Sequence, residues 1–142
     1  MGKFEIRTDQ RRRRSDKTQK ALNYQLEHVR IEFGMELIVL ADHNGLVVAS
    51  SGDDYAAKVF AVYACSLANG EPPNEALTAV APGVTADRII CRSITLDELP
   101  LYLCAVMLPT DDNVSAFERA RIGVQRIYYT TGEFTTDDYE LT

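Results

Sequence analysis

Leu37–Ser50 reads LIVLADHNGLVVAS, and this stretch decides the fold. Two short apolar runs, Leu37–Ala41 and Leu46–Ala49, flank the polar tetrad Asp42–Gly45. An Asn-Gly pair between apolar runs predicts a β-hairpin, because both residues tolerate the positive φ of a tight turn. Each run is continuously apolar rather than alternating, which is typical of a sheet covered on both faces. We therefore expect a covered hairpin with helices before and after it.

The composition is that of one ordinary soluble domain. The chain has 142 residues, of which 46% are hydrophobic and 25% are charged, enough for a substantial core. No apolar run approaches the roughly 20 residues that span a bilayer, and the N-terminus lacks the apolar core of a secretory signal. The three cysteines, Cys65, Cys91 and Cys104, lie in apolar segments. We expect them to be buried free thiols, which indicates a reducing, cytoplasmic location.

Charge divides the chain into a basic start and an acidic remainder. Residues 1–20 hold eight Lys/Arg and three Asp/Glu, a net charge of +5, whereas the other 122 residues carry −11. We expect residues 1–16 to form a flexible basic arm, because blocks of like charge repel one another. The acidic body argues against a specific nucleic-acid-binding domain.

The arginine run of this arm is the candidate site for a polyanion, such as nucleic acid or an acidic lipid surface. The alternative is a solvated tail that lies against its own acidic body. The run consists of Arg11, Arg12, Arg13 and Arg14.

The segment before the hairpin predicts a helix at about residues 17–33, capped by Ser15 and Asp16 and ended by Gly34. One stripe at helical spacing should pack on the sheet; it consists of Leu22, Leu26, Val29 and Phe33. A second, weaker stripe is either the margin of the first or a contact surface; it consists of Tyr24, His28, Ile31 and Met35. Tyr24 and Ile31 are therefore candidate partner-binding residues.

Residues 53–68 predict a second helix that is apolar over most of its circumference. Such a helix must be buried on more than one side. The sheet can cover one side, and either another element of the chain or a second subunit covers the other. We favour a second subunit, because small residues let two helices approach closely. The predicted dimer interface is the small-residue stripe Ala57, Ala61, Ala64 and Ala68; beside it lie a bulky stripe, Ala56, Phe60, Tyr63 and Leu67, and the apolar Val59 and Val62.

The rest of the chain predicts a loop at residues 70–86, strands at Asp87–Leu96 and Pro100–Leu108, and a third helix at about Val114–Thr131. Within the loop, Ala76–Ala81 has the pattern of a short helix or a strand. On the third helix, Ile122 and Tyr129 lie opposite the core face, so they are either candidate partner-binding residues or scattered surface apolars. Residues 132–142 are expected to be an acidic, flexible tail.

No catalytic, cofactor-binding or metal-binding residue is expected. The sequence has no Gly-rich phosphate loop, no Cys/His spacing of a zinc site and no nucleophile elbow. His28 and His43 have no second ligand at a suitable spacing, so we interpret both as non-ligands. The pairs Asp53–Asp54 and Asp111–Asp112 lie where helices begin, where they complement the helix dipole. The sequence therefore predicts a binding module rather than an enzyme.

The stretch ELIVLADHNGLVVASS, read with the order helix, hairpin, helix, linker, strands, helix, resembles the roadblock / dynein light chain family. The resemblance covers about residues 17–131 and also rests on Leu26, the helix Ala56–Ala68 and the apolar strand Leu101–Leu108. It implies an α/β (α+β) fold of profilin-like, roadblock architecture. In that fold a five-stranded antiparallel sheet is sandwiched between the second helix on one face and the first and third helices on the other.

The same resemblance implies a mode of action. It implies a homodimer, or a heterodimer with another roadblock-like chain, joined through the second helix and the neighbouring strand. It also implies a protein that acts without cofactors as a regulator or scaffold of Ras-like small GTPases, or as an adaptor on motors.

The chain departs from the family pattern in two places. Only two strands are evident after the second helix where the family has three, so the third is Ala76–Val80 or is lost. The basic arm and the acidic tail also lie outside the pattern. The alternative function is a small-molecule sensor of the PAS or GAF type, which needs an internal cavity lined by a few polar groups.

Overall fold

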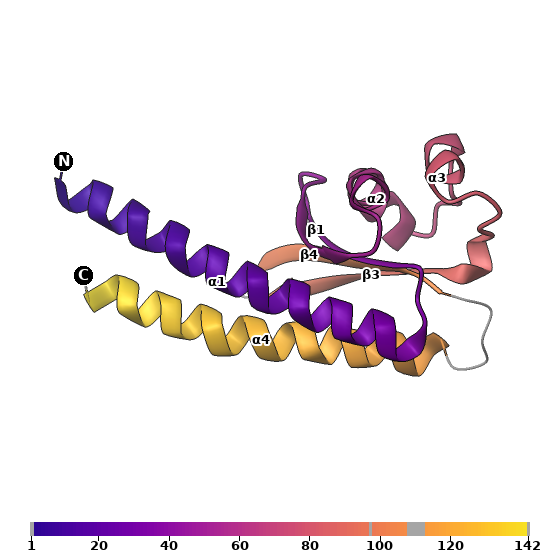
Figure 1. Cartoon of the computed structure of the whole chain (residues 1–142). Helices are drawn as coiled ribbons and strands as arrows, with labels where there is room; N and C mark the ends of the chain where they lie inside the picture. Colours follow the sequence, from indigo (N-terminus) through magenta and orange to yellow (C-terminus); the bar gives the residue numbers. More distant parts are fainter. Residues whose placement is uncertain (1, 97, 108–112, 142) are drawn as a thin grey trace.

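The computed structural model describes residues 2–96, 98–107 and 113–141, with side chains for 17–96, 98–107 and 115–129. Four strands and four α-helices follow one another along these residues (Figure 1). In chain order they are α1 (Gly2–Phe33), β1 (Leu37–Asp42), β2 (Val47–Ser51), α2 (Asp54–Ala68), α3 (Glu75–Val80), a 3-10 turn (Ala86–Arg88), β3 (Ile89–Leu96), β4 (Leu99–Val106) and α4 (Asn113–Leu141).

The strands form one antiparallel sheet in the order β2-β1-β4-β3. The expected fifth strand is wrong for the described residues, because Ala76–Val80 belongs to helix α3. Asn74 explains this helix: its side-chain oxygen accepts a hydrogen bond from the Leu77 amide, which caps the first turn. The α+β class is confirmed, with four strands in place of five.

The expected hairpin is confirmed as β1 and β2. In its turn, the Asp42 carboxylate accepts hydrogen bonds from the amides of Asn44 (2.9 Å) and Leu46 (3.0 Å). Gly45 has φ +80°, a conformation that glycine adopts without strain. The polar tetrad is therefore explained by the turn that it forms.

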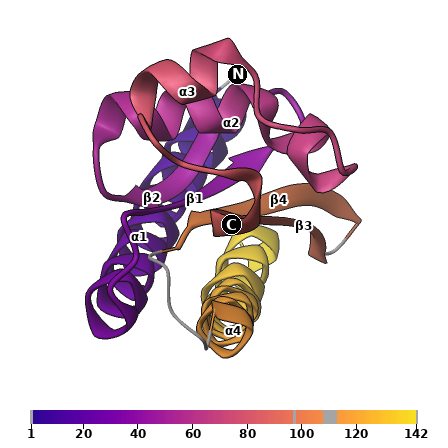
Figure 2. The ribbon, with the colours of Figure 1, turned by 90° about the vertical axis from the view of Figure 1, so that its right-hand side faces the viewer.

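Helices cover both faces of the sheet. Helices α2 and α3 lie on one face, and α1 and α4 pack side by side on the other (Figure 2). Successive residues of β1 alternate between two cores, because side chains of a strand point to opposite faces. Ile38 and Leu40 join the core under α1 and α4, whereas Val39 and Ala41 join the core under α2. The continuous apolar run of β1 is thus fully buried, as expected.

Arg88 connects the two central strands where the chain enters β1 and leaves β4. Its Nε donates to the carbonyl of Met107 (2.8 Å), and its Nη2 forms an ion pair with Glu36 (2.6 Å). The Met107 amide in turn donates to the Arg88 carbonyl (2.7 Å). We call this set of contacts the Arg88 staple. It ties together the two points at which the long helices attach to the sheet.

The expectation of three buried free thiols is wrong. Cys91 and Cys104 are buried, but they lie directly opposite each other in the β3–β4 register and form a disulfide. Cys65 is free and exposed on α2. Strand register decides this pairing, and the spacing of the cysteines along the chain did not reveal it. The cysteines therefore no longer support the expected reducing compartment.

Both long helices extend further than expected. Helix α1 begins at Gly2 rather than near Lys17, and α4 continues past Thr131 to Leu141. The sequence from Lys3 to Phe33 contains no glycine or proline, so nothing in it breaks the helix. The expected divisions at residues 16 and 131 fall inside these two helices. None of the helices in the described residues is long and apolar enough to cross a membrane.

Candidate functional site

The small-residue stripe of α2 faces its own sheet, which corrects the predicted dimer interface. Ala57, Ala61 and Ala64 are at most 1% exposed, and Ala68 is half-buried against the same core. Small side chains let the helix lie close to the strands, so that Cys91 Sγ is 3.3 Å from the Ala64 carbonyl oxygen. Ala57, Ala61 and Ala64 are therefore buried within one chain, and of this stripe only Ala68 is partly accessible to a second subunit.

The outer side of α2 carries exposed apolar residues instead. Tyr55 and Val62 are 63% and 61% exposed, and Val59 is half-buried beside them. The β1–β2 turn packs against this helix: a Cβ on Gly45 would lie 3.3 Å from Val62 Cα. Leu46, in the same turn, is 63% exposed. We call Leu46, Tyr55, Val59 and Val62 the α2 face. The sequence pointed to Val59 and Val62 as apolar surface, but not to Leu46 or Tyr55.

The four predicted partner-binding residues are all exposed on the opposite helical layer. Tyr24 and Ile31 lie two turns apart on α1, and Ile122 and Tyr129 lie two turns apart on α4. We call these four residues the α1/α4 face. Its two helices are fixed to each other: Arg119 pairs with Glu32 (3.7 Å) and lies over the Phe33 ring, 5.9 Å from its centroid.

The four residues do not gather at one point. Ile122 lines a groove of about 580 Å³ between α1 and α4, together with Gln25, His28 and Arg126. Tyr24 lines a second groove, on the other side of α1, and neither groove includes Ile31 or Tyr129. The structure therefore supports a broad contact face and not a single pocket.

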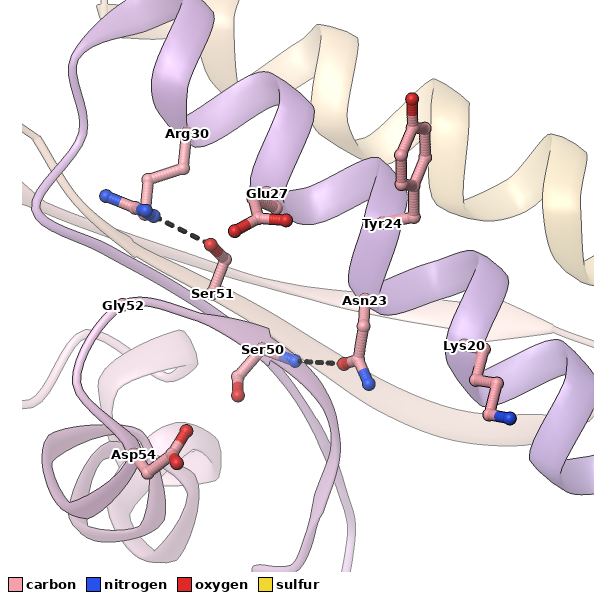
Figure 3. A pocket seen from close by; sticks show the side chains of 9 residues that line it. All are labelled: Lys20, Asn23, Tyr24, Glu27, Arg30, Ser50, Ser51, Gly52 and Asp54. Atoms are coloured by element: carbon pink, nitrogen blue, oxygen red, sulfur yellow. Dashed lines mark hydrogen bonds between the residues drawn. The ribbon is translucent and has the colours of Figure 1, made fainter.

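The second groove, of about 510 Å³, runs between α1 and the end of β2 (Figure 3). The Arg30 Nε donates to the Ser51 hydroxyl (2.7 Å), and the Ser50 amide donates to the Asn23 side-chain oxygen (2.9 Å). Glu27 points toward Ser51 from the same helix. These bonds satisfy the Ser50 amide and the Ser51 hydroxyl at the end of the edge strand β2, so α1 covers this end of the edge.

The opposite edge of the sheet is open. Strand β3 pairs with β4 alone among the described strands, and its Arg92, Ser93 and Thr95 are exposed. The Arg92 guanidinium donates to the carbonyl of Cys91 (2.9 Å) on the same strand. An open edge of this kind can accept a further strand. Sequence reasoning did not locate this edge, because it depends on the order of strands in the sheet.

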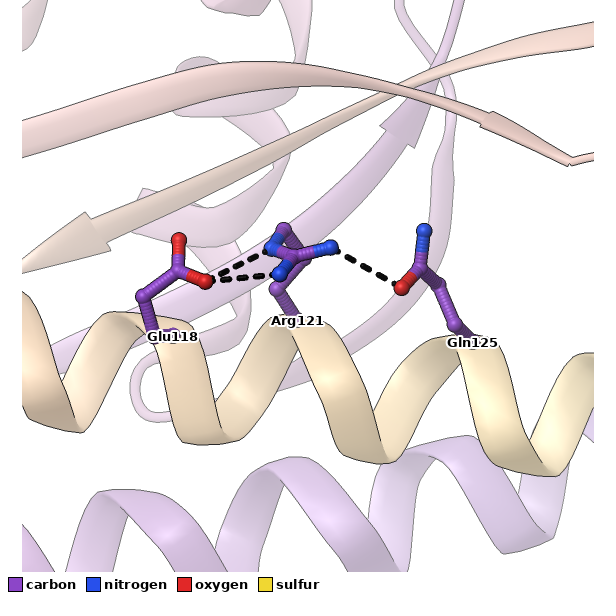
Figure 4. A network of polar contacts seen from close by, with 3 residues as sticks. All are labelled: Glu118, Arg121 and Gln125. Carbon is purple, nitrogen blue, oxygen red and sulfur yellow. Dashed lines mark hydrogen bonds and ion pairs between the residues drawn. The ribbon is translucent and has the colours of Figure 1, made fainter.

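A polar network stiffens α4 beside Ile122 (Figure 4). The Arg121 guanidinium donates to the Glu118 carboxylate through Nε (3.0 Å) and Nη2 (2.7 Å), and to the Gln125 side-chain oxygen through Nη1 (2.9 Å). The hydrogen bond from Arg121 lowers the pKa of Glu118, and the same contact raises the pKa of Arg121. The network spans two turns and restrains the side chains of Glu118, Arg121 and Gln125, which neighbour Ile122 on α4.

The described residues form no metal site, and the hollow beneath α2 is too small for a ligand. No three His, Cys, Asp or Glu side chains gather there to hold a metal ion. His28 is exposed and lies 3.5 Å from Glu32, and His43 is exposed in the hairpin turn. The hollow between α2, α3 and the sheet, which includes Phe60 and Leu77, has no room for a water molecule. This hollow gives no support to the PAS or GAF alternative.

No protein-family model and no curated protein matches the chain. Among solved structures, the chain is similar to Myxococcus xanthus MglB, with a TM-score of 0.49 and 12% sequence identity. The match covers 79% of this chain and 90% of that one.

Proposed function

We propose that this protein is a non-enzymatic, dimeric regulator or scaffold that binds a Ras-like small GTPase or a related signalling or motor partner. The observation that carries the proposal is the presence of two exposed apolar faces, the α2 face and the α1/α4 face, on opposite sides of one sheet. With two separate faces, a protein can form a dimer through one face and bind a different partner through the other. The layering of the helices also agrees with the roadblock resemblance of the sequence.

The α2 face supports pairing with a second copy of this chain, or with another roadblock-like chain. Its three most exposed members, Leu46, Tyr55 and Val62, are each more than 60% exposed. Apolar residues on one helix and an adjoining turn favour a protein contact over isolated exposure. A two-fold axis would bring the same patch of both subunits together. The open edge of β3 offers a second contact, through which two sheets could become continuous.

Light scattering at tens of micromolar tests the dimer. We expect a mass close to twice the 15.9 kDa of the chain. The double variant Tyr55→Glu, Val62→Glu should halve that mass, because buried unpaired carboxylates strongly oppose association. The matched control is Ile31→Glu, on the opposite face, which should leave the dimer intact. A monomeric wild-type protein would overturn the dimer.

Binding to purified small GTPases, each loaded with GDP or with a GTP analogue, tests the partner. We expect at least one of them to bind, and Ile31→Glu or Ile122→Glu to weaken that binding by about tenfold or more, as for central interface residues. Val62→Glu is the control and should bind normally. If all three variants bind equally well, the α1/α4 face is not the contact; if no GTPase binds in either state, the proposed partner class is wrong.

A further inference from the structure

The two long helices place opposite charges at the same end of the molecule. Helices α1 and α4 pack antiparallel against the sheet, with Gln25 next to Gly123 and Glu32 next to Arg119. Beyond the sheet, the N-terminal part of α1 and the C-terminal part of α4 extend toward the same side of the molecule, where both termini lie (Figure 1). The sequence of that part of α1 contains Arg11–Arg14. The corresponding part of α4 is acidic.

The acidic part is short and contains no compensating cation. From residue 127 to the end of the chain there are four carboxylates and no lysine or arginine; they are Glu133, Asp137, Asp138 and Glu140. The two oppositely charged segments extend toward the same side of the molecule (Figure 1). Attraction between opposite charges is screened over about 8 Å at physiological ionic strength, so any attraction between the two segments weakens when salt is added.

We propose that the basic segment of α1 binds an anionic lipid surface, and that the acidic segment of α4 competes with this surface for the same arginines. Clusters of basic residues are attracted to anionic lipids, each contributing independently near the surface. The apolar Phe4 and Ile6 precede the arginine run in the sequence, and apolar residues beside a basic cluster favour a lipid surface over nucleic acid. The acidic segment would then act as a built-in competitor that sets how strongly the protein binds.

The geometry also explains how an acidic protein could approach an anionic surface. The residues after position 20 carry a net charge of −11 and would be repelled by it. The basic segment extends away from the sheet, and a helix rises about 1.5 Å per residue. Contact through the end of α1 therefore keeps most of the acidic body beyond the screening length.

Sedimentation with vesicles of phosphatidylcholine containing phosphatidylserine tests the proposal on the full chain. We expect the wild type to bind weakly. The quadruple variant Arg11→Gln, Arg12→Gln, Arg13→Gln, Arg14→Gln should not bind. The double variant Asp137→Asn, Asp138→Asn, which we call the tail variant, should bind about fivefold more tightly than the wild type. The matched control is Glu71→Gln, Glu75→Gln, which changes the net charge equally in the connection before α3 and at its first residue; α3 lies far from both termini (Figure 1). This control should bind like the wild type.

Each other result overturns a defined part of the proposal. If the tail variant and the control both bind the vesicles equally more tightly, the net charge of the whole protein determines the affinity, and the acidic segment does not compete for the arginines. Vesicle binding that survives the loss of all four arginines would place the contact elsewhere. Binding of duplex DNA in the absence of any vesicle binding by the tail variant would assign the arm to nucleic acid. Circular dichroism of each variant verifies that it is folded.

Discussion

Gly52 shows how a single residue fixes the path between β2 and α2. Its φ of +120° is open to glycine and rarely adopted by other residues. A Cβ there would lie 2.9 Å from both the Glu36 carbonyl oxygen and Leu37 Cδ1, where real contacts do not occur. The glycine therefore allows the start of α2 to approach the entry to β1 closely.

We expect Gly52→Ala to lower the free energy of unfolding by about 2–3 kcal/mol, since it combines backbone strain with a collision against main chain. Urea denaturation monitored by circular dichroism measures the change. The matched control is Gly70→Ala, because Gly70 also has a positive φ (+88°) but no atom within 4 Å of the added carbon. Gly70→Ala should lower the free energy of unfolding by about 1 kcal/mol. Equal losses at both positions would mean that the close approach at Gly52 is unimportant.

The Glu118–Arg121 contact makes a further prediction at this scale. The pKa of Glu118 is lower in the folded protein than in the unfolded chain, where glutamate titrates at about 4.3. Its contribution to stability is therefore complete above that pH and is lost as pH falls through the lowered folded pKa. Arg121→Met should cause a small loss of stability at pH 7 that disappears in acid. Thermal unfolding between pH 7 and pH 3 measures it, with Arg126→Met on the same helix as the control; a loss that does not depend on pH would contradict the assignment.

At the scale of elements, α2 shows what periodicity can and cannot establish. The pattern correctly separated a bulky stripe from a small-residue stripe, because helical spacing alone determines which residues share a side. It could not decide which side faces the sheet, since small residues suit close packing against a strand as well as against a second helix. The dimer interface was therefore assigned to Ala57, Ala61, Ala64 and Ala68, whereas the exposed side holds Tyr55 and Val62.

The packing of this stripe can be tested by enlarging one of its members. Ala64 is fully buried against the sheet, so Ala64→Leu should force the helix outward and lower the free energy of unfolding by about 1–3 kcal/mol. The control is Lys58→Leu, at an exposed position of the same helix, which should change stability by less than about 0.5 kcal/mol. Chemical denaturation compares the two. If Ala64→Leu proves neutral, the helix does not lie as close to the strands as described.

Other elements also differ in whether neighbouring residues or contacts between distant parts of the chain determine their structure. The hairpin turn was predictable because Asp42, Asn44 and Gly45 determine it within a few residues. At α3, which Asn74 caps, the sequence allowed either a helix or a strand, because six residues are too few to show a period. The Cys91–Cys104 bond depends on the register of β3 and β4, which no local pattern specifies.

For the whole molecule, the layered architecture was predictable to the extent that it follows from continuous apolar strands, which require helices on both faces. The fifth strand was inferred from the family resemblance and is not present in the described residues. The exposure of Tyr24, Ile31, Ile122 and Tyr129 was predictable from helical phase, but their spread over a broad face was not, because it depends on how α1 crosses α4. The vesicle experiment and the dimer experiment use separate surfaces, so each can fail without the other.

The Arg88 staple has a mechanical consequence. Both terminal helices attach to the sheet beside it, since Glu36 precedes β1 and Met107 follows β4, and Leu37 is paired with Val106 in the register. A force that pulls the two termini apart would therefore first separate α1 from α4 and then act at one end of the β1–β4 ladder. The hydrogen bonds between β1 and β4 would then break one after another from that end, and not all at once as they would under a shearing force. The Arg88 contacts lie at the end of the ladder that is loaded first, so they resist the start of this second step, after α1 has separated from α4.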